Sequence, residues 1–293
     1  MRLHPHKLGA YLQLLRPFTL LAPVVGGFLF GWLALTDRKL PIEANLPLLL
    51  LSCLILAMAN ATSNILNQVF DRDLDAVNPE KRTRPIPSGG ASLDGAISIG
   101  VLLLISTIFL GLVLFGVFYG ALLSIILAFS WMYNSPPLRL KMRLGWGNFA
   151  ISAPRGGLGI MTAYSAFSDP LNLKIILATL YFGVYVFGTN TLKDFADYES
   201  DLKSGVRNFV TVYGKKTTSK VVSVFLLLPF LILALAGLWV PIAPTAFTPI
   251  ILSFIMMGVL WRSPEVKTKS LENNILWLMF YLQFLFMMVT YVL

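Results

Sequence analysis

The sequence has little of what a soluble or a disulfide-bonded protein needs. Only 13% of its 293 residues are charged, whereas a soluble globular domain is closer to a quarter charged. Cysteine occurs once, as Cys53 in the middle of an apolar run, which excludes an intrachain disulfide and suits a small packing residue. The two histidines, His4 and His6, lie near the N-terminus, where we expect no functional role.

Long apolar runs fill most of the chain, and 56% of the residues are hydrophobic. Runs such as 46–59, 101–118 and 221–240 approach or reach the length that crosses a bilayer. We therefore expect an all-α polytopic membrane protein, a single domain over 1–293 with about nine transmembrane helices around a central cavity. The expected spans are 17–36, 46–69, 95–117, 119–134, 147–168, 172–192, 221–240, 244–261 and 274–293.

The distribution of basic residues predicts the orientation. The formal charge of +9 is not a nucleic-acid signal, because Lys and Arg cluster in the N-terminus and in the loops after the second, fourth, sixth and eighth spans. The exceptions are Arg38, Lys39, Arg155 and Lys174. By the positive-inside rule these loops and the N-terminus face the cytoplasm, and the C-terminus lies outside. We expect residues 1–16 to form an interfacial helix.

One polar stretch, from Asn64 to Gly89, ends the second span with carboxylates and continues with basic residues. On a helix, positions four apart lie within roughly 40° of each other. This spacing predicts one face that carries Asn64, Asn67, Asp71 and Asp75, with Asp73 on the opposite side. Stacked carboxylates repel each other unless a cation lies between them. Oxygen ligands with room for water suit Mg²⁺ that holds a substrate phosphate.

The pattern occurs a second time, in residues 190–205. The two segments align without a gap, with an offset of 126 residues. Asn190 aligns with Asn64, Asp194 with Gln68, Asp197 with Asp71, and Asp201 with Asp75. A single Asp-x-x-x-Asp pair is a weak signal, and its carboxylates can be solvated interfacial charge. Two aligned pairs, each at the end of an apolar segment and followed by Lys and Arg, favour a functional site over solvated surface charge.

These residues resemble a known family, the UbiA superfamily of intramembrane prenyltransferases, and the resemblance covers nearly the whole chain. Residues 67–75 resemble its first Asp-rich motif, 84–89 the loop that follows, and 193–205 its second motif. Gln68 departs from the common form, which has Asp there. Homogentisate-type members also carry Gln at this position, so the departure concerns the subfamily.

The resemblance implies Mg²⁺-dependent transfer of a polyprenyl group of the geranylgeranyl or phytyl class from its diphosphate to a small-molecule or lipid acceptor. The product would be a prenylated quinone, a chlorophyll or an ether lipid. The two Asp motifs would lie on facing helices, with the isoprenoid tail in an apolar channel open to membrane lipid. The expected metal ligands are Asp71, Asp75, Asp197 and Asp201.

Other polar residues are expected around this centre. Asn67 and Asp194 would support the metal, and Lys193, Arg82, Arg84 and Arg207 would hold the diphosphate. Tyr133 resembles a tyrosine that the family places near the diphosphate, although it can equally be an interfacial anchor. Arg155 lies inside the fifth span, where a charge is costly and usually functional. It would bind an acidic group of the acceptor, or pair with a carboxylate or a carbonyl.

Two questions stay open at the level of sequence. A secondary transporter also has internal repeats and intramembrane acids, but its site lies near the bilayer midplane rather than at a cytoplasmic edge beside basic loops. The acceptor is also undecided. Residues 78–80, 136–141 and 145–148 are similar to the chlorophyll-synthase branch, whereas 193–205 look as much like archaeal lipid-ether and homogentisate-type members.

Overall fold

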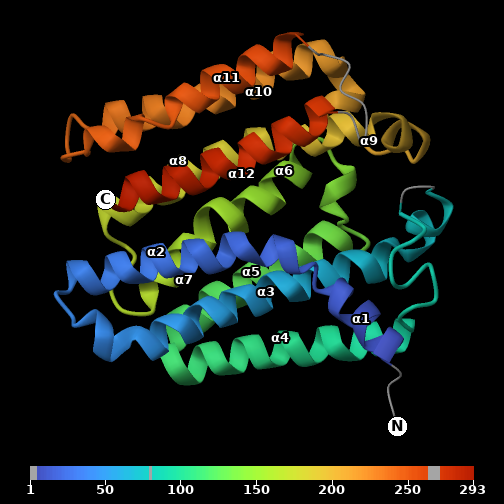
Figure 1. Cartoon of the computed structure of the whole chain (residues 1–293), viewed down its shortest axis with the longest axis horizontal. Helices are drawn as coiled ribbons and strands as arrows, with labels where there is room; N and C mark the ends of the chain where they lie inside the picture. Colours follow the sequence, from blue (N-terminus) through green and yellow to red (C-terminus); the bar gives the residue numbers. More distant parts are fainter. Residues whose placement is uncertain (1–4, 79–80, 263–270) are drawn as a thin grey trace. The chain divides into compact units, whose positions relative to one another are not determined.

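The computed structural model describes residues 5–78, 81–262 and 271–293, and within these ranges the chain forms helices and no β-strand (Figure 1). This confirms the all-α fold. Pro79 and Glu80 of the 78–80 segment lie outside the described residues, as does His4. The chain divides into two compact units, Met1–Arg139 with Ser165–Ser168, and Leu140–Tyr164 with Asp169–Leu293. The single domain over 1–293 stays a prediction.

The first unit is built around one long helix, α3, which packs against α2, α4 and α5. Gly27 on α2 permits a close approach, because a Cβ there would lie 3.4 Å from the Cα of Cys53 on α3. Tyr119 of α5 is fully buried, and its hydroxyl lies 3.0 Å from that of Ser52. The helices of this unit are α1 (Pro5–Leu14), α2 (Leu21–Asp37), α3 (Ile42–Val77), α4 (Leu93–Phe115) and α5 (Val117–Asn134).

The part of the chain after Arg139 has more breaks. Here α8 is central and packs against α6 and α10. Its fully buried aromatic side chains include Tyr185, which stacks on Phe280 and Phe284 of α12. The helices are α6 (Trp146–Ser152), α7 (Gly159–Ser165), α8 (Leu173–Thr189), α9 (Leu192–Lys203), α10 (Phe209–Ala236), α11 (Ile250–Arg262) and α12 (Leu271–Val292).

Within the described ranges, seven helices are long and apolar enough to cross a membrane, or eight if the bent pair α8 and α9 forms one span. These correspond to eight of the nine expected spans. The remaining one, 147–168, is interrupted: α6 gives way to a π-helical turn, Ala153–Leu158, before α7 begins. Pro154 lacks an N–H and disfavours regular α-helix at this point. The count of nine therefore stays a prediction.

The length of α3 determines where the first Asp motif lies. Its 36 residues extend about 54 Å at 1.5 Å per residue, far more than the roughly 30 Å of a hydrocarbon core. The helix does not end at residue 69, where the apolar run stops, but continues to Val77. The motif therefore occupies the last turns of a membrane-spanning helix, as a direct extension of it.

Candidate active site

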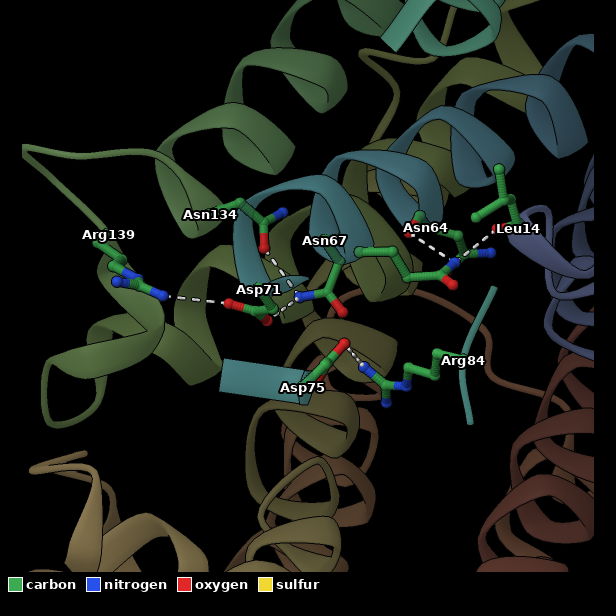
Figure 2. Close-up of polar contacts among 9 residues, drawn as sticks. Leu14, Asn64, Asn67, Asp71, Asp75, Arg84, Asn134 and Arg139 are labelled. Carbon is green, nitrogen blue, oxygen red and sulfur yellow. Dashed lines mark hydrogen bonds and ion pairs between the residues drawn. The ribbon is translucent and has the colours of Figure 1, made fainter. Parts of the chain in front are cut away.

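The first motif places a row of polar side chains at the end of α3 (Figure 2). The Asn67 amide donates to Asp71 Oδ2 at 2.9 Å, and also to Asn134 Oδ1 on α5 at 2.9 Å. Asn134 is itself held by donating to the Ser130 carbonyl at 2.9 Å. The position of Asn67 is therefore fixed from two helices, and Asn67 in turn orients Asp71.

Each carboxylate of this motif is paired with an arginine from a following loop. Arg139 Nη2 lies 3.1 Å from Asp71 Oδ1, and Arg84 Nη1 lies 2.6 Å from Asp75 Oδ2 (Figure 2). The two carboxylates are well shielded from solvent, with side chains 15% and 5% exposed, so the guanidinium groups offset their mutual repulsion.

Arg139 is a residue to which sequence reasoning gave no role. It follows Pro136 and Pro137, and its backbone φ of 36° lies in the left-handed region, which non-glycine residues seldom adopt. Its Nε is buried and has no hydrogen-bond partner within the described chain. The sequence offered one signal for it: a basic residue stands two positions after the proline pair that follows the end of α5.

Three other residues of this segment of α3 make different contacts. The Asn64 amide donates to the Leu15 carbonyl at 2.8 Å and thus binds the N-terminal segment instead of the row of Asp side chains. Asn64 lies about 20° from Asp71 around the helix axis, within the expected face, but its amide is engaged by the N-terminal segment. Gln68 is buried and donates to the Leu14 carbonyl at 2.9 Å. Asp73 points away, as expected, with a side chain that is 86% exposed beside Arg72.

The second motif lies on a broken helix. α8 ends at Thr189 and α9 begins at Leu192, with a bend of 40° between them. The Asn148 amide of α6 spans the break, donating to the Phe187 carbonyl at 2.7 Å and to Thr191 Oγ1 at 2.7 Å. Sequence reasoning quoted Asn148 only as part of a resemblance, yet this residue satisfies backbone that the break leaves without helical partners.

The acids of the second motif differ in burial along α9. Asp194 is buried, Asp197 is partly buried, and Glu199 is exposed. Asp201 Oδ2 accepts a hydrogen bond of 2.7 Å from the amide of Asn208. Asn208 also caps α10 through a reciprocal pair of bonds with Thr211, so the start of the next helix fixes Asp201.

The basic residues expected at the site are more scattered. Lys193 on α9 and Tyr133 on α5 are partly buried, whereas Arg82 and Arg207 are exposed. Arg155 is exposed on the π-helical turn, which refines the expectation of a charge within a regular span.

Oxygen donors dominate both motifs, and such donors suit Mg²⁺. Among the described residues, no three or more His, Cys, Asp or Glu side chains group closely enough to hold a metal ion by themselves. The pair on α3, Asp71 and Asp75, with the Asn67 amide beside it, is an incomplete ligand set. That donor set fits a magnesium ion whose remaining positions are filled by phosphate oxygens or water, as is usual for this ion.

Known proteins of similar sequence include lipid and pigment synthases. The digeranylgeranylglyceryl phosphate synthase of Methanocaldococcus jannaschii is 28% identical over 92% of this chain and 92% of its own length. The chloroplastic chlorophyll synthase of Avena sativa is 31% identical over 70% of this chain and 55% of its own length.

Solved structures share the fold. A structure described as a digeranylgeranylglyceryl phosphate synthase in membranes superposes with a TM-score of 0.71 and 21% identity, covering 98% of this chain and 97% of that one. A UbiA homologue from Archaeoglobus fulgidus, bound to GPP and Mg²⁺, superposes with a TM-score of 0.68 and 17% identity over 97% of this chain and 100% of that one. The model of the UbiA prenyltransferase family matches residues 38–289, and the chain therefore belongs to this family of membrane enzymes.

Proposed function

We propose that this enzyme transfers a polyprenyl group of the geranylgeranyl or phytyl class from its diphosphate to an acceptor, in a reaction that depends on Mg²⁺. The acceptor would lead to an ether lipid, a chlorophyll or a prenylated quinone. The observation that carries the proposal is the row Asn67, Asp71 and Asp75, in which each carboxylate lies against an arginine. Acids and guanidinium groups together suit a metal-bound diphosphate better than either does alone.

The proposed metal ligands are Asp71 and Asp75 on α3 and Asp197 and Asp201 on α9. When bound, Mg²⁺ neutralises the diphosphate and so makes it a better leaving group. Asn67 orients Asp71 through its amide, and we assign Asp194 the corresponding supporting role on α9. That the two motifs face one another stays a prediction.

The arginines of the first motif are proposed to bind the diphosphate as well. A guanidinium has five N–H donors, and the ion pair with Asp75 or Asp71 uses only part of this capacity. Arg84 and Arg139 can therefore keep their carboxylates and still donate to phosphate oxygens. Lys193, Arg82 and Arg207 add further positive charge. Departure of the diphosphate leaves an allyl cation, which an electron-rich acceptor attacks with loss of a proton.

Arg155 is the proposed contact for an acidic group of the acceptor. It is exposed, and within the described chain no carboxylate pairs with it. A π-helical turn in a membrane-spanning region often marks a functional position, and a charge there is costly unless it is used. Tyr133 is proposed to lie near the diphosphate end of the substrate.

We further propose that the N-terminus and both Asp motifs face the cytoplasm, since basic loops stay on that side. Reporter fusions after Leu293 and within 203–216 test this, and they should report opposite sides. Reports from the same side would contradict the proposed orientation.

The test of the reaction is a transfer assay on purified protein in lipid vesicles. Radiolabelled geranylgeranyl and phytyl diphosphates are incubated with Mg²⁺ or with EDTA, and with a panel of a glyceryl phosphate ether, a chlorophyllide and homogentisate. We expect labelled product and free diphosphate with one acceptor class, and none with EDTA. Uptake of label into vesicles without release of diphosphate would instead indicate a transporter.

A further inference from the structure

The N-terminal segment is attached to α3 by a row of three carboxamides that is separate from the Asp motif. Asn60, Asn64 and Gln68 are spaced four apart and so form a row along α3, about 60° around the helix axis from the row of Asn67 and Asp71. The Asn60 amide donates to the Thr19 carbonyl at 3.2 Å, Asn64 to Leu15 at 2.8 Å, and Gln68 to Leu14 at 2.9 Å. α3 thus carries two parallel polar rows, and only one of them is acidic.

The attachment is well buried and satisfies groups that would otherwise lack partners. Gln68 is 1% exposed and Asn64 is 5% exposed. Leu14 is the last residue of α1, and the final carbonyls of a helix have no partner within it. The Gln68 amide therefore binds the last carbonyl of α1, as Figure 2 shows at Leu14, and the Asn64 amide binds the carbonyl of the next residue, Leu15.

The same segment also holds the loop that carries Arg84. The fully buried Leu14 side chain packs in one cluster with Ile65 of α3 and Ala91 of the loop. The loop is closed on itself, because the Ala91 N–H donates to the Pro85 carbonyl at 2.8 Å. The Tyr11 hydroxyl lies 3.0 Å from that of Ser92, which caps α4. α1 therefore contacts both the helix that carries Asp75 and the loop that carries Arg84.

We propose that α1 is a strap that sets the position of Arg84 relative to Asp75, and that Gln68 is the positioning residue that fastens it. An Asp at position 68 would place an acceptor against the Leu14 carbonyl, whereas the amide of Gln supplies a donor. The contact with the N-terminal segment therefore accounts for Gln rather than Asp at position 68. The expected effect on binding of the prenyl diphosphate rests on the proposed function, whereas the attachment of α1 to α3 does not.

A distance measurement tests the strap directly. Spin labels are attached to cysteines at Leu12 and Ile97, which are 52% and 42% exposed, in the full chain with Cys53→Ala. We expect a narrow distance distribution that broadens in Gln68→Met, which keeps the volume and removes the donor. Asp73→Asn, an exposed change on the same helix, serves as the control and should leave the distribution narrow. A narrow distribution in Gln68→Met would overturn the strap.

Kinetics test the positioning role. Gln68→Met should raise the KM for the prenyl diphosphate by about tenfold, the size expected for a lost buried hydrogen bond, while kcat changes less. Tyr11→Phe should also raise this KM, and the two changes together should fall short of the product of their separate effects, because both act through α1. The positioning role of Gln68 would be overturned if the effects of the two changes on KM multiplied. It would also be overturned if Gln68→Met broadened the spin-label distance distribution but left KM unchanged. If the unaltered protein transferred no prenyl group, the proposed function would fail while the distance measurement still tested the strap.

Discussion

The two Asp motifs align residue for residue, yet the chain supports them in different ways. The first lies on the unbroken end of the 36-residue helix α3, and arginines from two loops neutralise its acids. The second lies on the 12-residue helix α9, set off from α8 by a 40° bend that Asn148 bridges. The first motif is thus positioned by continuity with its membrane helix, and the second by contacts on both sides of a break.

The changes with the largest expected effect test whether the two motifs do the same chemistry although one lies on an unbroken helix and the other beyond a bend. Asp71→Asn and Asp197→Asn, and likewise Asp75→Asn and Asp201→Asn, should each reduce turnover by a factor of about 1,000 or more, because each removes a proposed metal ligand. The proteins should stay folded, as judged by thermal unfolding in detergent. Asp73→Asn and Glu199→Gln are the matched controls and should keep most of the activity. Normal turnover by Asp197→Asn would remove the second motif from the mechanism.

Arg139 distinguishes the first motif from the second. Arg139→Met should lower kcat by about 100-fold, since the change removes donors near the leaving group and leaves Asp71 without its ion pair. Arg139→Lys keeps the charge but loses the forked geometry, and it should recover only part of the loss. Rapid-mixing measurement of diphosphate release provides kcat. Full recovery by Lys would mean that charge alone matters at this position.

Arg155 tests whether the C-terminal half of the chain also selects the acceptor. Arg155→Leu should raise the KM of an acidic acceptor by about tenfold, as for one lost hydrogen bond to a charged group, with little change for the diphosphate. Steady-state assays with each substrate varied in turn separate the two values. Arg82→Leu is a useful comparison, because there the larger change is expected in the diphosphate KM. Equal changes in both KM values for Arg155→Leu would contradict the assignment.

The smallest effect on activity is expected for changes to the residues that hold the break between α8 and α9 and the end of α9. Asn148→Ala leaves the Phe187 carbonyl and the Thr191 hydroxyl without their shared donor, and should destabilise the protein by about 1–3 kcal/mol. A lower thermal unfolding midpoint would report this, with a loss of activity below about tenfold. Asn208→Ala, which releases Asp201 and a helix cap, should behave similarly. If neither variant lost stability, the hydrogen bonds of Asn148 and Asn208 would not be what stabilises the broken helix.

The parts of the fold that depend on local pattern could be predicted from the sequence. Apolar runs gave the class and eight of the expected spans, and the spacing of four placed Asn67 and Asp71 in contact. Partners that come from distant segments could not be predicted. Nothing in the spacing of α3 indicates that Arg139 meets Asp71, because the turn after α5 sets that contact. The contacts of Asn64 could not be predicted for a related reason, because its amide donates to the Leu15 carbonyl and to Thr19 Oγ1, which the spacing within α3 does not indicate.

The unbroken course of α3 has a mechanical consequence. From Leu49, beyond the internal Pro47, to Asp75 the helix extends about 40 Å, so a tilt of about 5° moves its acidic end by about 3 Å. Helices adjust their tilt to the thickness of the surrounding bilayer. α3 therefore acts as a lever that converts bilayer thickness into displacement of one set of carboxylates. The break between Thr189 and Leu192 prevents α8 and α9 from moving as one rigid rod. Lipids of different chain length should therefore displace the carboxylates of α3 and those of α9 by different amounts.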